Sequence, residues 1–133
     1  HPFRYARVLD IYHADVTFEA RGEHPVRSSR HILFVHWYRQ DPLFKGGFNH
    51  RRYHRLEFLP ATDSDAFGFL DPDDVIHAAH VIPAFAHGRT DSLLAGMTVA
   101  RPTGELDDWR YYYVNLFVDR DLYMRYRGGG VGH

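Results

Sequence analysis

Residues 31–39 read His31-Ile-Leu-Phe-Val-His-Trp-Tyr-Arg39, and this stretch decides the fold. In an extended chain its side chains divide at a period of two into Leu33, Val35 and Trp37 on one face and Ile32, Phe34, His36 and Tyr38 on the other. Both faces are largely apolar. This pattern is typical of a strand that lies inside a closed or doubly covered sheet.

The segments around this strand predict a mainly β domain. An apolar strand, Tyr5-Ala-Arg-Val-Leu-Asp-Ile-Tyr12, precedes it and continues through Asp15-Val-Thr-Phe18 past a bulge. Arg21 to Ser29 is predicted to be a loop because Gly, Pro and paired Ser do not sustain a strand ladder. The other predicted elements are strands at Tyr53–Phe58, Val75–Ile76, Val81–Pro83 and Trp109–Val118, a short helix starting at Asp71-Pro72, a surface connection from His87 to Asp108 and a helix from Asp119 to Arg127. Together they predict one small β-barrel with one or two short helices.

Composition sets the class of protein. The 133 residues suffice for a single domain with its own core, and 44% hydrophobic with 25% charged residues is ordinary globular usage. The aromatic share of 16% favours strands, and the absence of cysteine excludes disulfides, thiolate zinc sites and cysteine nucleophiles. No run approaches the ~20 apolar residues of a membrane span, so no membrane partner is expected. Because the chain starts at His1, we expect residues 1–133 to be one domain excised from a longer protein.

Charge is unevenly distributed along the chain. Residues 21–55 carry eight basic and two acidic residues, whereas residues 57–74 carry six acids and neither Lys nor Arg. The net charge is nevertheless only −1. One end of the molecule is therefore suited to phosphate, and the other to a basic peptide. The alternative is that both segments are ordinary solvated loops.

Aromatic side chains supply the first candidate site. A Trp face flanked by Tyr rings can hold a methylated ammonium by cation–π attraction worth roughly 0.5–2 kcal/mol per contact. The candidate cage residues are Tyr12, Trp37, Tyr38, Trp109 and Tyr111, and Tyr113 is a further candidate wall. Asp41 lies four residues beyond Trp37 and could complement the ligand's charge. The alternative is that these alternating aromatics form the core of the sheet.

The second candidate site is the basic segment from Lys45 to Arg55. Its cations are interleaved with Phe48 and Tyr53, and nucleic-acid surfaces combine Arg for phosphate with rings for stacking. The candidate phosphate contacts are Lys45, Arg51, Arg52 and Arg55. An ordinary exposed hairpin is the alternative explanation.

Histidine pairs supply a third, metal-binding alternative. His77 and His80 at i, i+3 would share a face of a helix near the acids at 71–74, and His50 and His54 offer a similar pair at i, i+4. If residues 77–80 form a strand, the two histidines point to opposite faces.

No serine has a Gly-x-Ser-x-Gly setting. We therefore expect no cofactor, no metal and no catalytic activity, and keep a His/Asp metal-dependent hydrolase as the lesser alternative.

Several of these motifs together resemble a fungal family. They are Tyr5-Ala-Arg-Val8, Phe34-Val-His-Trp-Tyr38, Arg52-Tyr-His-Arg55, Ala66-Phe-Gly-Phe-Leu-Asp-Pro72, His80-Val-Ile-Pro-Ala-Phe85, Trp109-Arg-Tyr-Tyr-Tyr-Val-Asn115, Val118-Asp-Arg-Asp121 and Arg125-Tyr-Arg-Gly-Gly-Gly-Val-Gly-His133. This set resembles the C-terminal region of basidiomycete proteins associated with Plavaka-type transposases of the Kyakuja–Dileera–Zisupton group. The resemblance implies a nuclear, transposon-derived parent whose DNA-cleaving acids lie in a different domain, so no strand-transfer residue is assigned to this chain.

A second resemblance concerns the fold. The order Ala6-x-Val8, Val35-x-Trp-Tyr-Arg39, the apolar pairs near residues 75 and 81, and Tyr111-Tyr-Tyr113 is similar to bromo-adjacent-homology (BAH) domains. These are β-barrel chromatin modules, and the resemblance implies a histone tail or nucleosome surface as partner. Only Trp37 carries over as a cage wall. The segment from Leu43 to His54 departs from that family in length and basicity, which favours a DNA or nucleosome contact.

Three hypotheses follow. The first is a non-catalytic chromatin- or DNA-binding module in which the basic segment contacts phosphate and Trp37 reads a peptide. The second is a structural accessory domain that packs against the rest of its parent chain and binds no ligand of its own. The third is the metal-dependent hydrolase.

Overall fold

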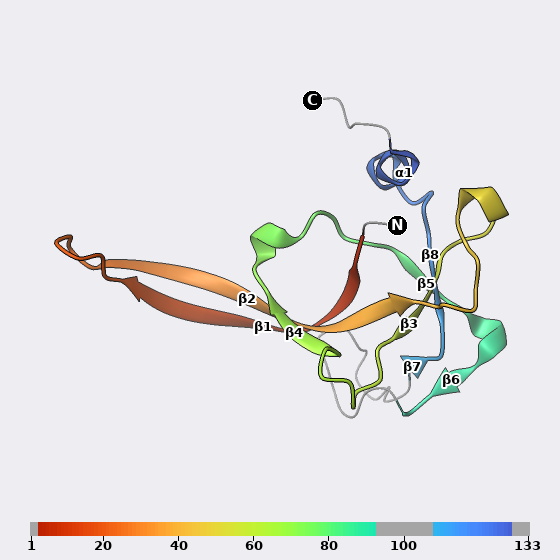
Figure 1. Ribbon diagram of the computed structural model, residues 1–133, viewed down its shortest axis with the longest axis horizontal. Coiled ribbons are helices and arrows are strands. Elements are labelled where there is room, and N and C mark those ends of the chain that lie inside the picture. Colours follow the sequence, from red (N-terminus) through yellow and green to blue (C-terminus); the bar gives the residue numbers. More distant parts are fainter. Residues whose placement is uncertain (1–2, 93–107, 129–133) are drawn as a thin grey trace.

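Two long antiparallel strands, β1 (Tyr5–Phe18) and β2 (Val26–Gln40), organise the molecule (Figure 1). The computed structural model describes residues 3–92 and 108–128. The remaining strands are β3 (Arg55–Phe58), β4 (Phe67–Leu70), β5 (Val81–Pro83), β6 (Arg89–Thr90), β7 (Asp108–Trp109) and β8 (Tyr112–Val114). The helices of these described ranges are three single-turn 3-10 helices, η1 (Phe48–His50), η2 (Pro72–Asp74) and η3 (Phe85–His87), and one α-helix, α1 (Arg120–Arg127).

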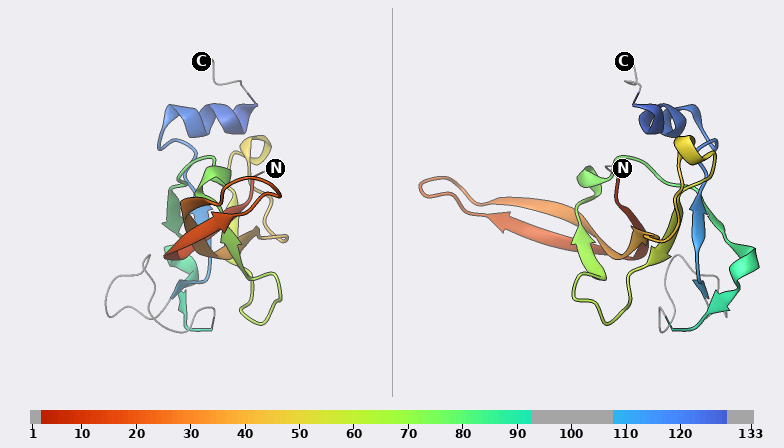
Figure 2. Two further views of the ribbon diagram at one scale, coloured as in Figure 1. Left: turned by 90° about the vertical axis from the view of Figure 1, so that its left-hand side faces the viewer. Right: turned by 45° about the vertical axis from the view of Figure 1, so that its right-hand side comes forward.

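The main sheet is antiparallel and open. Its strands follow the order β1-β2-β3-β8-β5, with β4 beside β3 on the same edge of β2, and β6 pairs with β7 in a separate ribbon. The mainly β class is therefore confirmed. The barrel closure is not found: among residues 3–92 and 108–128 no pairing joins β5 back to β1. A physical reason is visible in the hairpin, since half of β1 runs away from the body rather than around it (Figure 2).

The hairpin β1–β2 forms a projecting arm, drawn in red and orange in Figure 1. Its ladder runs from the Tyr5–Tyr38 pair out to the Phe18–Val26 pair, with a bulge between Val8 and Asp10. Beyond Leu33 no third strand joins β2 among the described pairings, because β4 ends opposite that residue. The outer part of the arm is thus a two-stranded ribbon exposed on both faces.

The predicted loop at Arg21–Ser29 is wrong in its second half. Residues 26–29 belong to β2, where Ser28 pairs with Val16 and Ser29 with Asp15. The low strand propensity of serine is overridden because the continuing ladder supplies partners for its backbone groups. Only residues 19–25 remain as the turn.

The predicted last strand, Trp109–Val118, is split. Trp109 pairs with Arg89 in the β6–β7 ribbon, whereas Tyr112 pairs with both Leu56 and Pro83 in the main sheet. The chain changes partners between them, where the Arg110 amide donates to the Gly88 carbonyl. The predicted strand at Val75–Ile76 is also absent, and the Tyr53–Phe58 strand begins only at Arg55.

The two predicted helix starts are confirmed. Asp71 accepts a hydrogen bond from the Asp73 amide at the start of η2, with Pro72 at the first helical position. Asp119 accepts from the Leu122 amide at 2.8 Å and caps α1, which ends at Gly128 in the left-handed region. Most of the predicted connection from His87 to Asp108, and the Gly-rich ending after residue 128, lie outside the described residues. No helix of the described ranges has the length and apolar character to cross a membrane.

The core lies where β1, β2, β3 and β8 meet. Its buried members are Tyr5, Leu9, Tyr38, Leu56, Phe58, Tyr112, Val114 and Leu116. Phe58 stacks on Tyr38 with centroids 4.1 Å apart and meets Tyr112 edge-on at 5.7 Å. Aromatic pairs of this kind stabilise by about 0.5–1.5 kcal/mol beyond their buried area. Much of the high Tyr and Phe content is therefore structural.

A buried ion pair borders this core. Arg7 Nη1 lies 2.5 Å from Asp108 Oδ1, and Arg7 Nη2 donates to the Tyr112 hydroxyl at 3.0 Å. The Tyr112 hydroxyl in turn donates to Asp108 at 3.3 Å, and the Arg7 guanidinium stands 4.7 Å from the centroid of the Phe58 ring. The pair ties the first strand to β7, which are about a hundred residues apart in the chain.

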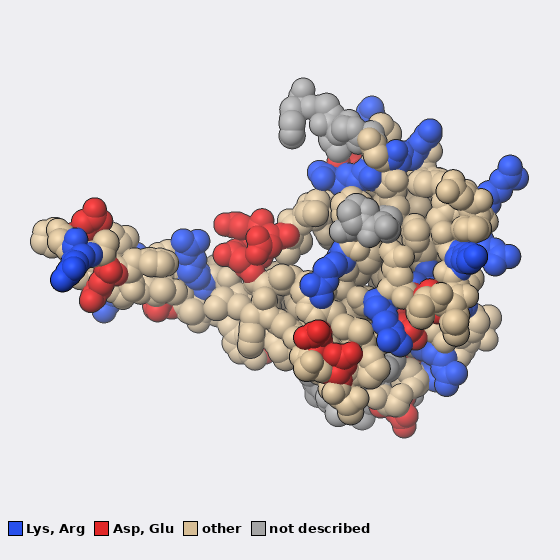
Figure 3. All heavy atoms as spheres, in the orientation of Figure 1, with Lys and Arg blue, Asp and Glu red and all other residues tan. Residues whose placement is uncertain are grey.

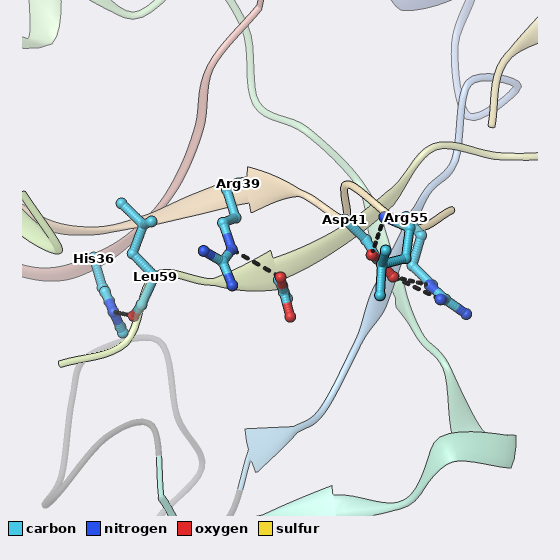
Figure 4. A network of polar contacts seen from close by, with 7 residues as sticks. His36, Arg39, Asp41, Arg55 and Leu59 are labelled. Carbon is cyan, nitrogen blue, oxygen red and sulfur yellow. Dashed lines mark hydrogen bonds and ion pairs between the residues drawn. The ribbon is translucent and has the colours of Figure 1, made fainter. Parts of the chain in front are cut away.

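His36 is fully buried between two phenyl rings. Phe58 and Phe67 each stack on the imidazole at 4.5 Å, and Nε2 donates to the Leu59 carbonyl at 2.7 Å (Figure 4). Burial lowers the pKa of His36 from its ordinary value of 6.5. The pKa of half-buried His54 is also lowered by burial.

These two shifts predict a loss of stability in mild acid. The unfolded chain takes up protons at pH 6.5 and below, while the folded protein resists them until lower pH, so the free energy of unfolding falls as pH drops below 6.5. Each pKa unit of difference corresponds to about 1.4 kcal/mol. His36→Phe should flatten the dependence of unfolding free energy on pH between 6.5 and 5, measured by urea unfolding. An unchanged slope in this variant would contradict the assignment of that titration to His36.

Candidate nucleic-acid interface

The basic loop, residues 42–54, projects between β2 and β3 and contains no acidic residue. Its outer part is closed by a bridge in which the Gly47 amide donates to the Arg52 carbonyl at 2.7 Å. Gly46 lies so close to the returning strand that a Cβ there would stand 2.5 Å from the Tyr53 carbonyl oxygen. Glycine is therefore required at this position. Between these points η1 presents Phe48 and is followed by Arg51 in the left-handed conformation, at φ 52°.

Three of the four predicted phosphate contacts are exposed. Lys45, Arg51 and Arg52 all lie on the solvent side of the basic loop. In the view of Figure 3 basic side chains are spread over the body, including the side near η1, while the arm mixes both signs. Residues 10–31 of the arm carry four acids and three arginines. The basic loop therefore differs from the arm in carrying cations without any acid.

Arg55 is the exception, because its charge is compensated inside the protein. Its Nε and Nη2 bind Asp41 Oδ2 at 2.8 and 2.6 Å, and Asp41 is 94% buried with Oδ1 accepting from the Leu43 amide (Figure 4). The guanidinium also packs between the rings of Phe44 and Tyr111, at 4.2 and 4.4 Å. These contacts fix the base of the basic loop. Asp41 therefore serves Arg55 and not the aromatic cage.

The candidate cage residues occupy separate surroundings. Tyr38 is buried against Phe58, Trp109 meets Phe85 edge-on at 4.9 Å, and Tyr111 meets the His87 ring at 5.2 Å. Tyr12 pairs with Ile32 on the arm and its ring contacts Phe69. Tyr38 is only 8% exposed, and this burial raises the pKa of its phenol.

Trp37 lies on the opposite face of β2 from Tyr38, as the alternation predicts. The register places Tyr12 five residues away along β2, which corresponds to about 17 Å. The Arg4 guanidinium covers the Trp37 ring at 4.0 Å, and the indole nitrogen stands close to Gly68. A cation of the protein itself thus occupies one face of the indole.

The histidines of the metal alternative have different neighbours. His77 Nε2 lies 3.5 Å from Asp119 Oδ2 and 3.9 Å from Asp121 Oδ2, while His80 Nδ1 lies 3.1 Å from Asn115 Nδ2. Residues 77 and 80 sit in neither a helix nor a strand. Within residues 3–92 and 108–128, no group of three or more His, Asp or Glu side chains is arranged to hold a metal ion.

Two exposed rings of the basic loop, Phe48 and Tyr53, lie beside two rings from the C-terminal part of the described chain, Phe117 and Tyr123, and we call these four the ring cluster. Tyr53 lies 6.1 Å from Phe117, Phe117 lies 5.5 Å from Tyr123, and Tyr123 lies 5.8 Å from Phe48, between ring centroids. Phe117 and Tyr123 were not predicted as site residues. Their contact with the basic loop spans some seventy residues of sequence, and no local pattern marks it.

Comparison with known proteins adds no assignment: no family model, no curated protein and no solved structure matches the chain.

Proposed function

We propose that this domain is a non-catalytic nucleic-acid-binding module that docks on DNA through the basic loop. The observation that carries the proposal is the exposed cationic side chains of Lys45, Arg51 and Arg52 beside the exposed rings of the ring cluster. Arginine and lysine neutralise phosphate, and neighbouring rings offer stacking surfaces. The nuclear, chromatin-associated setting and the transposon-derived parent belong to this proposal through the sequence resemblance.

The conformation of Arg51 supports the same site. A non-glycine residue in the left-handed region is uncommon, and such residues occur at ligand-binding positions more often than elsewhere. The Arg51 amide donates to the Phe48 carbonyl, which fixes η1 against the start of the Arg51-Arg52 pair. The loop therefore holds its two adjacent arginines on a defined turn.

Peptide reading by Trp37 has weaker support than phosphate binding. A methylated lysine would have to displace Arg4 from the indole or use its other face. The remaining cage candidates have ring partners of their own. We therefore assign the basic loop, and not Trp37, as the primary contact.

Salt dependence tests the proposal. Binding to DNA should weaken steeply as salt rises, and Arg51→Ala with Arg52→Ala should lower the magnitude of the slope of log K against log salt by about two, one for each phosphate contact. Fluorescence anisotropy of labelled DNA at several salt concentrations measures this slope. Arg27→Ala with Arg30→Ala on the arm is the matched control and should leave the slope unchanged. Absence of binding at low salt, or equal slopes for the wild type and the loop variant, would refute the proposal.

A structural accessory role is the second candidate, and the arm favours it. Ile11, Tyr12, Phe18 and Val26 are each about half exposed or more on the two-stranded part of the hairpin. Exposed apolar side chains that gather on one element commonly mark an interaction surface. In this reading the arm packs against another part of the parent chain. Absence of nucleic-acid binding by the domain at low salt, with the protein folded, would favour this role.

A further inference from the structure

Two hollows lie side by side on the basic loop and share one wall. The first has a volume of about 440 Å³ and is lined by Gly47, Phe48, Arg51, Arg52, Tyr53, Leu116 and Phe117. The second, of about 340 Å³, is lined by Phe44, Arg52, Tyr53 and Tyr113. Both volumes fall in the range of roughly 300–1,000 Å³ that small-molecule sites occupy. Arg52 and Tyr53 stand between the two.

Each hollow combines rings with arginine and contains no acid. Phe117 is 64% exposed, Phe48 43% and Tyr53 37%, so their faces are accessible at the first hollow. In the second, Phe44 and Tyr113 pack with centroids 6.0 Å apart, and the Arg52 guanidinium lies 5.9 Å from the Phe44 ring. The acids at the start of α1 are engaged elsewhere, since Asp119 caps the helix and Asp121 binds Arg125 at 2.8 Å. Both hollows thus offer ring faces and a guanidinium to a ligand.

We infer that the two hollows accept unpaired nucleobases, and that the module therefore prefers single-stranded to double-stranded nucleic acid. This inference rests on the proposed function and names its substrate class. A duplex offers phosphates to arginine but hides the faces of its bases in the stack, leaving only base edges in the grooves. A single strand offers both phosphates and base faces, and proteins that bind it combine a cationic path with aromatic platforms.

The shared wall defines how a strand would lie. Consecutive bases would enter the two hollows on either side of Tyr53, and the connecting phosphate would meet Arg52. Arg51 would meet a phosphate next to the first hollow. Such contacts use ring faces and phosphate rather than base edges, so little sequence preference is expected.

The test compares a thymidine oligomer with a duplex of equal length at the same salt concentration, using anisotropy and the whole 133-residue chain. The single strand should bind more tightly. Phe117→Ala should weaken its binding roughly 5- to 150-fold, the range that corresponds to the loss of one base–ring stack. Phe117→Tyr keeps a ring and should restore binding. Phe85→Ala removes an equally exposed ring on η3 that lines neither hollow and should change nothing.

The outcomes separate the two proposals. If neither form binds, the proposed function fails together with this inference. A second outcome is that the single strand and the duplex bind equally, that the salt slope still depends on Arg51 and Arg52, and that Phe117→Ala has no effect. In that case the proposed function stands and the single-strand inference is overturned. Thymidine monophosphate is the third ligand. If it competes as strongly as the oligomer, the site is one for free nucleotides and the inference is also overturned.

Discussion

Removing either member of the Arg7–Asp108 pair should cost about 3–5 kcal/mol of unfolding free energy. The Arg7 side chain is 16% exposed and that of Asp108 5%, so each single variant leaves a buried charge without its counter-charge and away from water. Asp108→Asn also weakens the acceptor of the Tyr112 hydroxyl, which lies 3.3 Å away. Urea unfolding of Arg7→Met and Asp108→Asn, followed by circular dichroism, measures the effect.

Two controls separate the cost of an unpaired buried charge from the cost of lost side-chain packing. The double variant Arg7→Met, Asp108→Leu leaves no unpaired charge and should recover much of the stability, since apolar replacements of buried pairs are often neutral or stabilising. Arg39→Ala breaks the Arg39–Glu57 pair, in which the Arg39 side chain is 48% exposed, and should cost less than about 1 kcal/mol. If Arg7→Met costs no more than Arg39→Ala, the Arg7–Asp108 pair is solvated and our account of it is wrong.

Asp41→Ala should destabilise the protein by about 3 kcal/mol or more and also weaken nucleic-acid binding. The Asp41 carboxylate holds Arg55 Nε and Nη2 and accepts from the Leu43 amide, so its removal leaves a mostly buried guanidinium without a counter-charge. The basic loop begins one residue later, and Phe44, which packs on Arg55, lines the second hollow. Stability is measured by urea unfolding and affinity by anisotropy on the same preparation.

Asp41→Asn separates the two roles of this side chain. It keeps an acceptor for the Leu43 amide but removes the charge, so its stability should fall between those of the wild type and Asp41→Ala. Glu57→Ala is the exposed-pair control and should leave both stability and binding close to wild type. Wild-type affinity in a folded Asp41→Ala protein would show that the Asp41–Arg55 pair does not position the loop.

The predictable parts of this fold depend on neighbours in sequence. The alternation at residues 31–38 identified β2, and the Asp119 cap identified α1, because both signals come from adjacent residues. The strand conformation of residues 26–29 does not follow from the local sequence, since their pairing partners in β1 decide it. The division of residues 109–118 does not follow from the local sequence either, because Trp109 and Tyr112 pair with different strands.

The candidate site was predictable only in part. The basic segment was evident from composition, and its Lys45, Arg51 and Arg52 are exposed. The pairing of the Arg55 charge with Asp41 is not evident from the sequence, because fourteen residues separate the partners and no periodic pattern connects them. Phe117 joins the site only through contacts between segments far apart in the chain.

The projecting hairpin has a consequence for the protein's fluctuations. Its backbone bonds form one continuous ladder, yet the core supports only the end near Tyr5 and Tyr38. When the hydrogen bonds between β1 and β2 break from the turn at residues 19–25 inward, little additional apolar surface becomes exposed until the opening reaches Leu33. Breaking the hydrogen bonds at the other end of the ladder requires the body to unfold. The rate of amide deuterium uptake should therefore decrease gradually along β1 and β2, from the tip of the arm to the body.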